Sequence, residues 1–249
     1  MILTMAREPS AQEKKRIESI IDRFSTDQNL VERFMKSILE ELRVPKLKPF
    51  VHSIKSRVKE PDRLRDKLIR KLNACKAEGR PFEYTPENLY EKITDLAGVR
   101  ILHLHTRQIV EINRYINEMI EEQSLTLVEK PSARTWDDEY RQIFKDAGID
   151  TQVSPTLYTS VHYVVGAKSK TPVTCEIQVR TLMEEVWGEV DHTINYPHPN
   201  ASVACREQIR ALARVTSSST RLVDAIFATV DDLKNSTVDS TKHKAKKRR

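Results

Sequence analysis

Apolar positions in the first part of the chain recur every three or four residues, which is the spacing of an amphipathic helix. Between about Ser10 and Glu41 these positions are Ile17, Ile20, Ile21, Phe24, Leu30, Phe34, Ile38 and Leu42. The polar run Ser25-Thr26-Asp27 can interrupt the pattern and cap a second helix. We therefore expect two helices, closed by Pro45 and Pro49, that pack on the remaining chain or contact another subunit of a homo-oligomer.

The pattern then changes between period two, typical of strands, and the helical period. Phe50 to Lys59 alternates and predicts a strand with its cations on one side, and Pro61 to Lys71 predicts a helix with Leu64, Leu68 and Leu72 inside. Further along, we expect a short helix from Glu87 to Lys92, a buried strand from Thr94 to Leu104, a helix from Gln108 to Glu122 and a short strand from Leu125 to Glu129. The polar segment from Lys130 to Pro155 has Trp136, Tyr140 and Phe144 at a spacing of four, which predicts a short helix anchored to the core.

Two alternating runs, Tyr158 to Val165 and Val173 to Val179, are separated by the turn-forming sequence GAKSKT and predict a β-hairpin. Period two places Val161, Tyr163 and Val165 on one face with Val173, Cys175, Ile177 and Val179. The other face carries Tyr158, Ser160, His162, Glu176, Gln178 and Arg180. We hypothesise a register in which His162 lies opposite Glu176 and Tyr158 lies opposite Arg180. This polar face could bind a charged, planar ligand such as a nucleotide, or it could be an ordinary solvated face.

After the hairpin, Met183, Val186, Trp187, Val190 and Ile194 predict the apolar stripe of another helix, which Pro197 and Pro199 end. On that helix Glu189-x-x-His192 matches half of a dimetal motif, and we interpret it as surface. A final helical region is expected from Ala201 to about Lys234. The last residues, STVDSTKHKAKKRR, predict a disordered basic tail that could contact RNA.

Composition narrows the class of protein. The chain has 249 residues, 39% of them hydrophobic and 31% charged, which allows one sizeable helix-rich domain with additions or two small ones. Much of the net charge of +6 lies in the last eight residues, so any anion site must be a local cluster. The three cysteines are widely spaced and indicate reduced thiols, and no run of about 18 apolar residues is present. We expect a cytoplasmic protein that does not contact membranes.

One local cluster of cations follows from the predicted elements. Arg57 and Lys59 end the first strand, and Arg63, Lys67 and Arg70 share one stripe of the following helix. Their convergence near a helix N-terminus would suit a polyphosphate, although basic residues on such a helix are often simply solvated. Asp95 begins the buried strand, where Mg²⁺ sites are commonly built, or it caps a helix. The pair His103 and His105 is interpreted as structural because no further soft ligands accompany it.

The order of these motifs resembles the synthetase domain of RelA/SpoT proteins, and in size the chain looks like the stand-alone small alarmone synthetases. The resemblance spans about residues 53–196 and rests on Arg57-Val-Lys59, Lys67, Asp95-Leu-Ala-Gly-Val-Arg100, Tyr158-Thr-Ser-Val-His162, Glu176-Ile-Gln-Val-Arg-Thr181, Trp187 and Asp191-His192. It implies an α/β (α+β) fold with a nucleotidyltransferase-like mixed sheet of about five strands flanked by helices. We divide the chain into a helical region 1–48, the synthetase-like domain 49–199, a helical region 200–235 packed on it, and the tail 236–249.

The resemblance also implies a reaction, in which the β,γ-pyrophosphate of ATP passes to the ribose 3′-hydroxyl of GDP or GTP and AMP leaves. By matched position, Arg57, Lys59 and Lys67 would hold the ATP phosphates, with Arg100 on the same side. Asp95 and Glu176 would hold Mg²⁺, and Glu176 would also help to deprotonate the hydroxyl. Tyr158 would stack on the acceptor base and His162 would contact its phosphates, while Gln178 and Arg180 belong to the same motif.

Three positions depart from the family pattern: Leu157 where Gly usually precedes the stacking Tyr, Arg63 where Ser is usual, and Asp191 where Glu precedes His192. The segment from Lys130 to Pro155 is also extended. Two alternatives therefore stay open. The acceptor could be another 3′-hydroxyl, on an adenine nucleotide or a tRNA end, or the chain could be a catalytically silent nucleotide-binding module. Retention of both Asp95 and Glu176 disfavours the silent module.

Overall fold

A six-stranded mixed sheet forms the centre of the computed structural model, which describes residues 8–195 and 202–246. The strands lie in the order β1-β2-β6-β5-β3-β4. Their bounds are β1 Ser53–Val58, β2 Ala97–His103, β3 Thr126–Thr135, β4 Asp150–Val153, β5 Ser160–Gly166 and β6 Thr174–Thr181. β2–β6 and β3–β4 are parallel pairs and the others are antiparallel. This confirms the expected mixed sheet, and β4 is the strand that the sequence pattern does not reveal.

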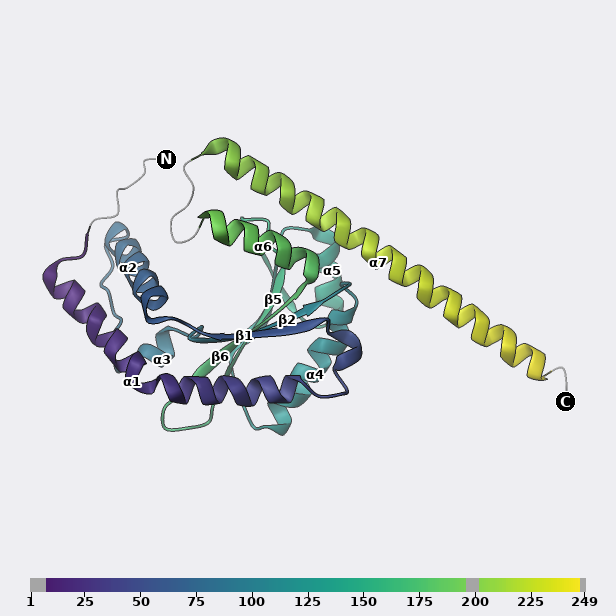
Figure 1. Cartoon of the computed structure of the whole chain (residues 1–249), viewed down its shortest axis with the longest axis horizontal. Coiled ribbons are helices and arrows are strands. Elements are labelled where there is room, and N and C mark those ends of the chain that lie inside the picture. Colours follow the sequence, from purple (N-terminus) through teal and green to yellow (C-terminus); the bar gives the residue numbers. More distant parts are fainter. Residues whose placement is uncertain (1–7, 196–201, 247–249) are drawn as a thin grey trace.

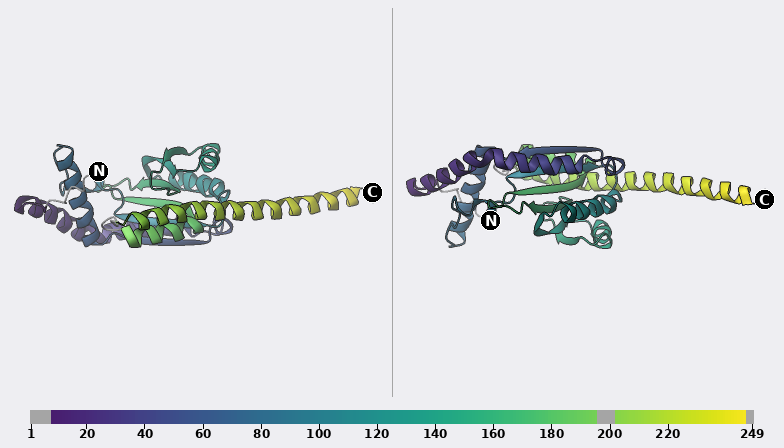
Figure 2. Two further views of the ribbon diagram at one scale, coloured as in Figure 1. Left: turned by 90° about the horizontal axis from the view of Figure 1, so that it is seen from above. Right: turned by 90° about the horizontal axis from the view of Figure 1, so that it is seen from below.

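Helices cover both faces of the sheet (Figures 1 and 2). On one face lie α1 (Ala11–Leu42) and α4 (Gln108–Glu122), and over the other lie α6 (Leu182–Asn195) and α7 (Val203–Lys246). Shorter elements are the 3-10 helix Lys48–Phe50, α2 (Pro61–Ala77), α3 (Leu89–Lys92) and α5 (Asp138–Asp146). The main core fills the space between α1, α4 and the sheet, and in it the hydroxyl of Tyr163 donates to Asn113 of α4 at 2.8 Å. The apolar sheet face predicted for the hairpin is therefore the core face.

The predicted break in the first helical region is wrong, because α1 is continuous from Ala11 to Leu42. The polar residues at the expected break find partners within or beside the helix. Thr26 donates to the carbonyl of Asp22 at 2.9 Å, and Asp27 pairs with Arg23 at 2.8 Å and accepts from Tyr90. Back-bonding by a threonine satisfies its hydroxyl without ending the helix and often bends it, and Figure 1 shows a bend along α1.

The hairpin forms, but its predicted register is wrong by two residues. His162 lies opposite Gln178 and Val164 lies opposite Glu176, and the strand begins at Ser160, after Tyr158. The loop closes with the amide of Ala167 donating to Val173 at 3.0 Å, so pairing extends further toward the turn than the hypothesis placed it. Because side chains alternate with period two, a shift of two preserves each residue's face. The polar face is therefore as predicted, while the directly opposed pairs are different.

The apolar stripe predicted for α6 is only partly correct. Trp187 is buried, but Met183 and Val186 are exposed, while Glu184 and Glu185 are buried against the sheet. The sheet face beneath α6 is the polar one, so it selects carboxylates that can pair with its cations over aliphatic side chains. Hydrophobic periodicity misplaces this helix because its partner surface is charged.

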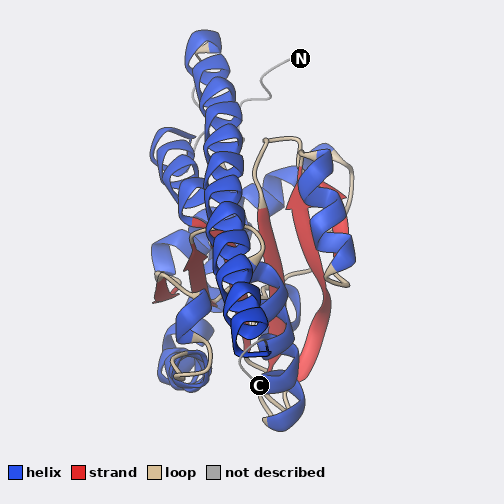
Figure 3. Ribbon diagram, turned by 90° about the vertical axis from the view of Figure 1, so that its right-hand side faces the viewer, coloured by secondary structure: helices blue, strands red, loops and turns tan. Residues whose placement is uncertain are grey.

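The C-terminal helix is longer than predicted. α7 continues to Lys246, so residues 236–246, expected to be a disordered tail, are helical. This sequence lacks Gly and Pro, and lysines near a helix C-terminus interact favourably with the helix dipole. Figure 3 shows the strands behind α7 when the molecule is viewed from the end toward which this helix projects. Pro197 and Pro199, predicted to end α6, lie outside the described residues, as does the domain boundary proposed there.

Across the ranges 8–195 and 202–246, no helix combines the length and apolar character that crossing a bilayer would need.

Candidate active site

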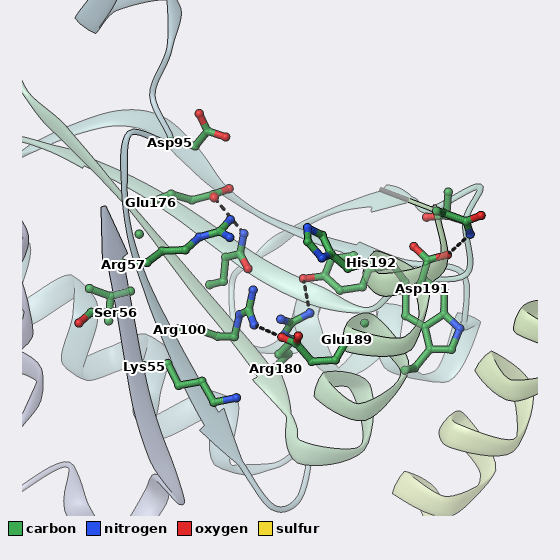
Figure 4. A pocket seen from close by; sticks show the side chains of 18 residues that line it. Lys55, Ser56, Arg57, Asp95, Arg100, Glu176, Arg180, Glu189, Asp191 and His192 are labelled. Atoms are coloured by element: carbon green, nitrogen blue, oxygen red, sulfur yellow. Dashed lines mark hydrogen bonds and ion pairs between the residues drawn. The ribbon is translucent and has the colours of Figure 1, made fainter. Parts of the chain in front are cut away.

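Two carboxylates from different elements meet beside the sheet. Asp95 lies two residues before β2, and Glu176 lies on β6, the parallel neighbour of β2, opposite Gly98. Both line a cavity of about 580 Å³ under α6, and both also line a second cavity of about 280 Å³ beside β3. Figure 4 shows the two side chains next to each other at one end of the larger cavity. The structure therefore brings together the two carboxylates that the sequence analysis expects to lie close to each other.

Both carboxylates are held in their ionised form. Burial raises the pKa of Asp95, but the ammonium groups of Lys67 and Lys59, at 2.7 and 3.2 Å, outweigh it and bring the pKa below its ordinary value. Burial acts in the same direction on Glu176, and the hydrogen bond and charge of His162 outweigh it, so this pKa is also lowered. Oxygen donors that remain charged at neutral pH are the ligands that Mg²⁺ prefers.

The cations predicted to hold phosphates are distributed around Asp95. Lys59 and Lys67 pair with it directly, and burial lowers the pKa of Lys59 although Asp95 opposes the shift. Arg57 and Arg100 line the larger cavity, whereas Lys67 lines the smaller one. Of the five cations expected to converge, Lys59, Arg63 and Arg70 line neither cavity, although Lys59 reaches Asp95. The cluster of cations around Asp95 and the two cavities therefore contains fewer residues of α2 than the predicted helical stripe.

Glu176 is fixed from both sides on the polar sheet face. Nδ1 of His162 lies 2.8 Å from one carboxylate oxygen, and the amide of Gln178 donates to the other at 2.9 Å. The predicted contact between His162 and Glu176 thus exists, but it runs diagonally across the two strands, since their backbones are not opposed. Nε2 of His162 is buried without a hydrogen-bond partner in this structure. Its ring lines the smaller cavity and is placed to meet a ligand there.

Tyr158 lies at the wall of the larger cavity, just before β5. Arg180 donates from Nη1 to its hydroxyl at 3.2 Å, and the tilted ring of Trp187 lies 5.9 Å away between centroids. The preceding residue, Leu157, has a φ of 63°, in the left-handed region that favours glycine. The chain therefore retains at Leu157 a backbone conformation that suits the Gly of the family pattern, at a cost in strain.

An ion-pair network centred on the buried carboxylate of Glu185, which the sequence does not reveal, supports the polar face. Glu185 of α6 accepts from Lys55 and Arg100, each at 2.9 Å, and pairs with Arg180 at 2.5 Å. Glu189 pairs with Arg100 as well, at 2.9 Å. The signal that could indicate a carboxylate-bearing partner above the sheet is the set of cations on one face, Lys55 and Arg57 of β1 and Arg100 of β2. Arg180 is almost fully buried by these contacts, so it holds its neighbours in place.

Glu189 and His192 are exposed, as the surface interpretation expects, but the surface that they share lies at the site. Both line the larger cavity, together with Asp191 and Asn195, and Figure 4 shows them on the α6 side opposite Arg57 and Arg100. Burial lowers the pKa of His192, and the nearby guanidinium groups of Arg63 and Arg57 lower it further. The sequence correctly predicts that the two residues lie close together on one helix, and that part of α6 faces the larger cavity.

The pair His103 and His105 belongs to the packing of the sheet end. His103 is buried, its Nδ1 lies 3.0 Å from the carbonyl of His105, and burial lowers its pKa to about 4. His105 stacks on Phe227 of α7 at 4.4 Å between ring centroids. Within the part of the chain that the structure describes, no cluster of three or more His, Cys, Asp or Glu side chains forms a candidate metal site.

Comparisons with known proteins identify a family and related folds. A family model described as a region found in RelA/SpoT proteins matches residues 56–201. GTP pyrophosphokinase YwaC of Bacillus subtilis (strain 168) is 29% identical over 153 residues, and the match spans 59% of this chain and 59% of that relative. The chain therefore matches less than two thirds of the relative's length.

Solved structures share the fold. The crystal structure of small alarmone synthetase 1 from Bacillus subtilis has a TM-score of 0.53 at 20% identity and covers 83% of this chain and 99% of its own. A GTP pyrophosphokinase family protein from Streptococcus pneumoniae has the same TM-score, 0.53, at 15% identity and covers 90% of this chain and 97% of its own. A further structure of the Bacillus subtilis enzyme, bound to its product pppGpp, matches with a TM-score of 0.53 at 20% identity over 80% of this chain and 97% of that one.

Proposed function

The chain belongs to the RelA/SpoT family, and we propose that it is an ATP-dependent pyrophosphokinase that transfers the β,γ-pyrophosphate of ATP to the 3′-hydroxyl of GDP or GTP. The observation that carries the proposal is the meeting of Asp95 and Glu176 between two cavities, beside Lys59 and Lys67. The name of the Bacillus subtilis relative, a GTP pyrophosphokinase, supports the same reaction.

The reaction makes one bond and breaks one bond. The acceptor's 3′-oxygen attacks the β-phosphorus of ATP, the bond from that phosphorus to the bridging α,β-oxygen breaks, and AMP leaves with the electron pair. The proton of the hydroxyl passes to Glu176, whose lowered pKa keeps it unprotonated beforehand. Such a displacement needs mainly neutralisation of charge and in-line placement of the two substrates.

Asp95 and Glu176 fit a magnesium ion, because both are ionised, both offer oxygen donors and both face the same two cavities. When bound, the ion would neutralise charge on the transferred phosphates. Lys59 and Lys67 already occupy one side of Asp95, so they keep its carboxylate oriented and add positive charge where the donor phosphates would lie.

In this proposal Arg57, Lys59, Lys67 and Arg100 bind ATP, and Tyr158 and His162 bind the acceptor. The two cavities do not separate the ATP-binding residues from the acceptor-binding residues. Arg57 and Tyr158 both line the larger cavity, and Lys67 and His162 both line the smaller one. The two nucleotides would therefore lie side by side, with their phosphates meeting at Asp95 and Glu176. A combined space of this size suits ligands that fill pockets of roughly 300 to 1,000 Å³.

Tyr158 offers a ring for stacking on the acceptor base, with Arg180 holding its hydroxyl. His162 presents its unpartnered Nε2 to the smaller cavity, where Lys130 and Arg134 of β3 supply further positive charge suited to acceptor phosphates. Gln178 contacts Glu176 directly, so we assign it to holding that carboxylate.

A second candidate is the same transfer to a different 3′-hydroxyl, on an adenine nucleotide or an RNA end. It is motivated by Leu157 beside Tyr158 and by the extended segment from Lys130 to Pro155. This segment contains the end of β3, which lines the smaller cavity, followed by α5 and β4. The basic C-terminal sequence would then contact RNA.

ATP labelled at the γ-phosphate, incubated with Mg²⁺ and each acceptor in turn, tests the proposal. Label in a guanosine product together with AMP release supports the first candidate, and label on an adenine nucleotide or RNA supports the second. Nucleotide binding without AMP release in any mixture would overturn both and leave a silent binding module. The Glu176→Gln protein serves as the inactive control in each assay.

A further inference from the structure

Gly188 lies in the interior of α6, at the wall of the larger cavity. Glycine is the least favourable residue after proline inside a helix, because it loses more backbone freedom on folding than other residues. Its φ is not in the left-handed region, unlike those of Gly79 and Gly148, which need the absence of a side chain. The backbone of α6 therefore gives no reason for a glycine at this position.

The space that a side chain would take at Gly188 is occupied by Arg180 of β6. A Cβ at this position would lie 2.6 Å from Nη1 of Arg180 and 3.5 Å from its Cζ. The first distance is well short of a normal contact between non-bonded heavy atoms. Figure 4 shows Arg180 reaching from the sheet toward α6. The guanidinium fits under this helix because residue 188 has no side chain.

The guanidinium of Arg180 has little freedom to move aside. It is almost fully buried, and its Nη2 pairs with the buried carboxylate of Glu185 at 2.5 Å. Nη1, which an added methyl group would meet, is also the atom that donates to the hydroxyl of Tyr158 at 3.2 Å. A normal contact with that methyl group needs a shift of Nη1 by about 1 Å. Such a shift changes how Arg180 meets Tyr158.

The ring of Tyr158 has two neighbours that depend on adjacent positions of α6. Cζ of Arg180 lies 5.5 Å from the centroid of the ring, and the tilted ring of Trp187 lies 5.9 Å away between centroids. Trp187 is itself fixed by the bond from its indole to the carbonyl of Ile209 at 3.0 Å. Position 187 thus supplies one support of the tyrosine ring, and position 188 leaves room for the other.

We propose that Gly188 is a positioning residue of the acceptor site, which by leaving room for Arg180 sets the place of the Tyr158 ring on which the acceptor base stacks. The inference rests on the proposed function. A side chain at position 188 displaces the guanidinium beside the ring, whereas Tyr158→Phe leaves it in place. The ion pairs of Asp95 with its two lysines do not involve Arg180, so the ATP side should be affected less.

Steady-state kinetics of Gly188→Ala test the proposal. We expect the KM for the acceptor to rise about fivefold, while kcat and the KM for ATP stay within about twofold of wild type. Val186→Ala introduces alanine on the exposed side of the same helix, away from Arg180, and should change none of the three. Equal increases in both KM values, or an unchanged KM for the acceptor, would overturn the proposal.

Adding Gly188→Ala to Tyr158→Ala separates positioning of the ring from a general effect on the helix. The ring is absent in that background, so the KM for the acceptor should not rise further. A further rise of about fivefold would show that residue 188 acts without Tyr158, and the proposal would then be wrong.

Calorimetry with GDP and no ATP distinguishes a failure of this proposal from a failure of the proposed function. A wild-type protein that transfers no label to any acceptor refutes the proposed function, and the dissociation constant for GDP still tests Gly188. A constant about fivefold higher for Gly188→Ala than for wild type supports the positioning role. Equal constants, or no binding of GDP by either protein, overturn it.

Discussion

Each oxygen of the Glu176 carboxylate has its own side-chain partner. One carboxylate oxygen lies 2.8 Å from His162 and the other accepts from Gln178 at 2.9 Å, so the group cannot rotate without losing a partner. A carboxylate fixed in this way can hold an ion and receive a proton with little rearrangement at the moment of reaction. Asp95 is similarly fixed by two lysines.

Replacing either carboxylate by its amide should remove turnover and leave the fold intact. We expect Glu176→Gln and Asp95→Asn each to lower kcat at least about a thousandfold, since each removes one of the two charges that we propose to hold the metal ion in a reaction that depends on charge neutralisation. Initial rates with labelled ATP measure the loss, and circular dichroism checks the fold. Glu121→Gln on the exposed end of α4 is the matched control. A double variant with near-normal turnover would refute the assignment.

Tyr158→Ala should raise the KM for the acceptor at least about fivefold more than the KM for ATP, because loss of a stacking ring costs about 1 to 3 kcal/mol for the base that it contacts. Tyr158→Phe keeps the ring and loses the hydrogen bonds of the hydroxyl, with Arg180 among its partners, so its effect on either KM should be small. Steady-state kinetics with one substrate varied at a time separate the two constants. Equal increases for both substrates in the alanine variant would remove Tyr158 from the acceptor pocket.

Leu157 allows a prediction about strain. At a φ of 63°, a side chain costs about 1 to 2 kcal/mol that glycine does not incur. Leu157→Gly and Leu157→Ala both lose the leucine's packing, so their difference isolates the backbone. We expect the glycine variant to be the more stable of the two by about 1 kcal/mol in urea unfolding, the reverse of the usual order. An alanine variant that is equally stable would show that the left-handed conformation is not maintained.

Among the elements, α6 joins the site to the C-terminal helix, and it presents two adjacent glutamates with opposite properties. Glu184 is buried with one oxygen unpartnered, and burial raises its pKa to about 8. Glu185 is buried too, but the hydrogen bond from Lys55 and the charges of Arg180 and Arg100 outweigh burial and lower its pKa. One is a neutral acid at neutral pH and the other is an ionised partner of three cations.

The pair predicts a pH dependence of stability. Between the ordinary pKa of 4.5 and the folded value of about 8, the unfolded chain releases the proton of Glu184 while the folded chain retains it. The free energy of unfolding should therefore fall as pH rises through this range, by at most about 1.4 kcal/mol per pH unit from this group. Glu184→Gln should remove that slope and become increasingly more stable than wild type toward pH 8 in denaturant unfolding.

Glu185→Gln is the matched control on the neighbouring position. It leaves the buried Arg180 without its ion-pair partner, while Arg100 keeps its pair with Glu189 and Lys55 is largely exposed, so we expect it to destabilise the fold by roughly 3 kcal/mol at pH 7. The lowered pKa means that Glu185 stabilises the fold above pH 4.5 and loses this effect as pH falls through the folded value, so the penalty of the variant should shrink in acid. Parallel stability curves for the two variants would contradict both assignments.

Elements that pack through apolar faces could be predicted closely from the sequence. The helix expected from Gln108 to Glu122 has the same bounds as α4, because its stripe meets an apolar sheet face. Elements that pack against polar surfaces could not be predicted closely in this way. The buried side of α6 is marked by Glu184 and Glu185 beside Trp187, and not by a row of apolar residues. β4 has no buried side chain, so its sequence shows no hydrophobic pattern. Periodicity reports burial in an apolar partner, so it fails where the partner is charged.

The site was predictable to the extent that its residues lie on regular strands. Alternation placed His162, Glu176, Gln178 and Arg180 on one face, and the structure keeps them there despite the shifted register. The approach of Asp95 to Glu176 depends on a parallel pairing between distant strands, which the motif order indicates and local pattern does not. Glu185 was missed because a lone glutamate on a helix is normally solvated.

At the scale of the whole molecule, α7 connects the two sides of the site. Near its start, the indole of Trp187 donates to the carbonyl of Ile209 at 3.0 Å, and Leu157 and Tyr158 pack on the same small cluster. Further along, Ser217 and Arg221 contact Asp137, which caps α5. Tyr158 and helix α5 are thus both positioned by one long helix.

Shortening this helix in two steps should separate its roles. A chain that ends at Lys234 keeps every described contact between α7 and the body, so we expect its melting temperature and both KM values to match those of the full chain. A chain that ends at Ser202 exposes Trp187 and removes the partners of Asp137, at a cost of roughly 3 kcal/mol or more. It should melt at least several degrees lower. Where it still folds, its acceptor KM should rise more than its KM for ATP, because Tyr158 loses its support while Asp95 and the lysines keep theirs. Equal stability of all three chains would show that α7 only rests on the body, and that the sheet alone holds Tyr158 in place.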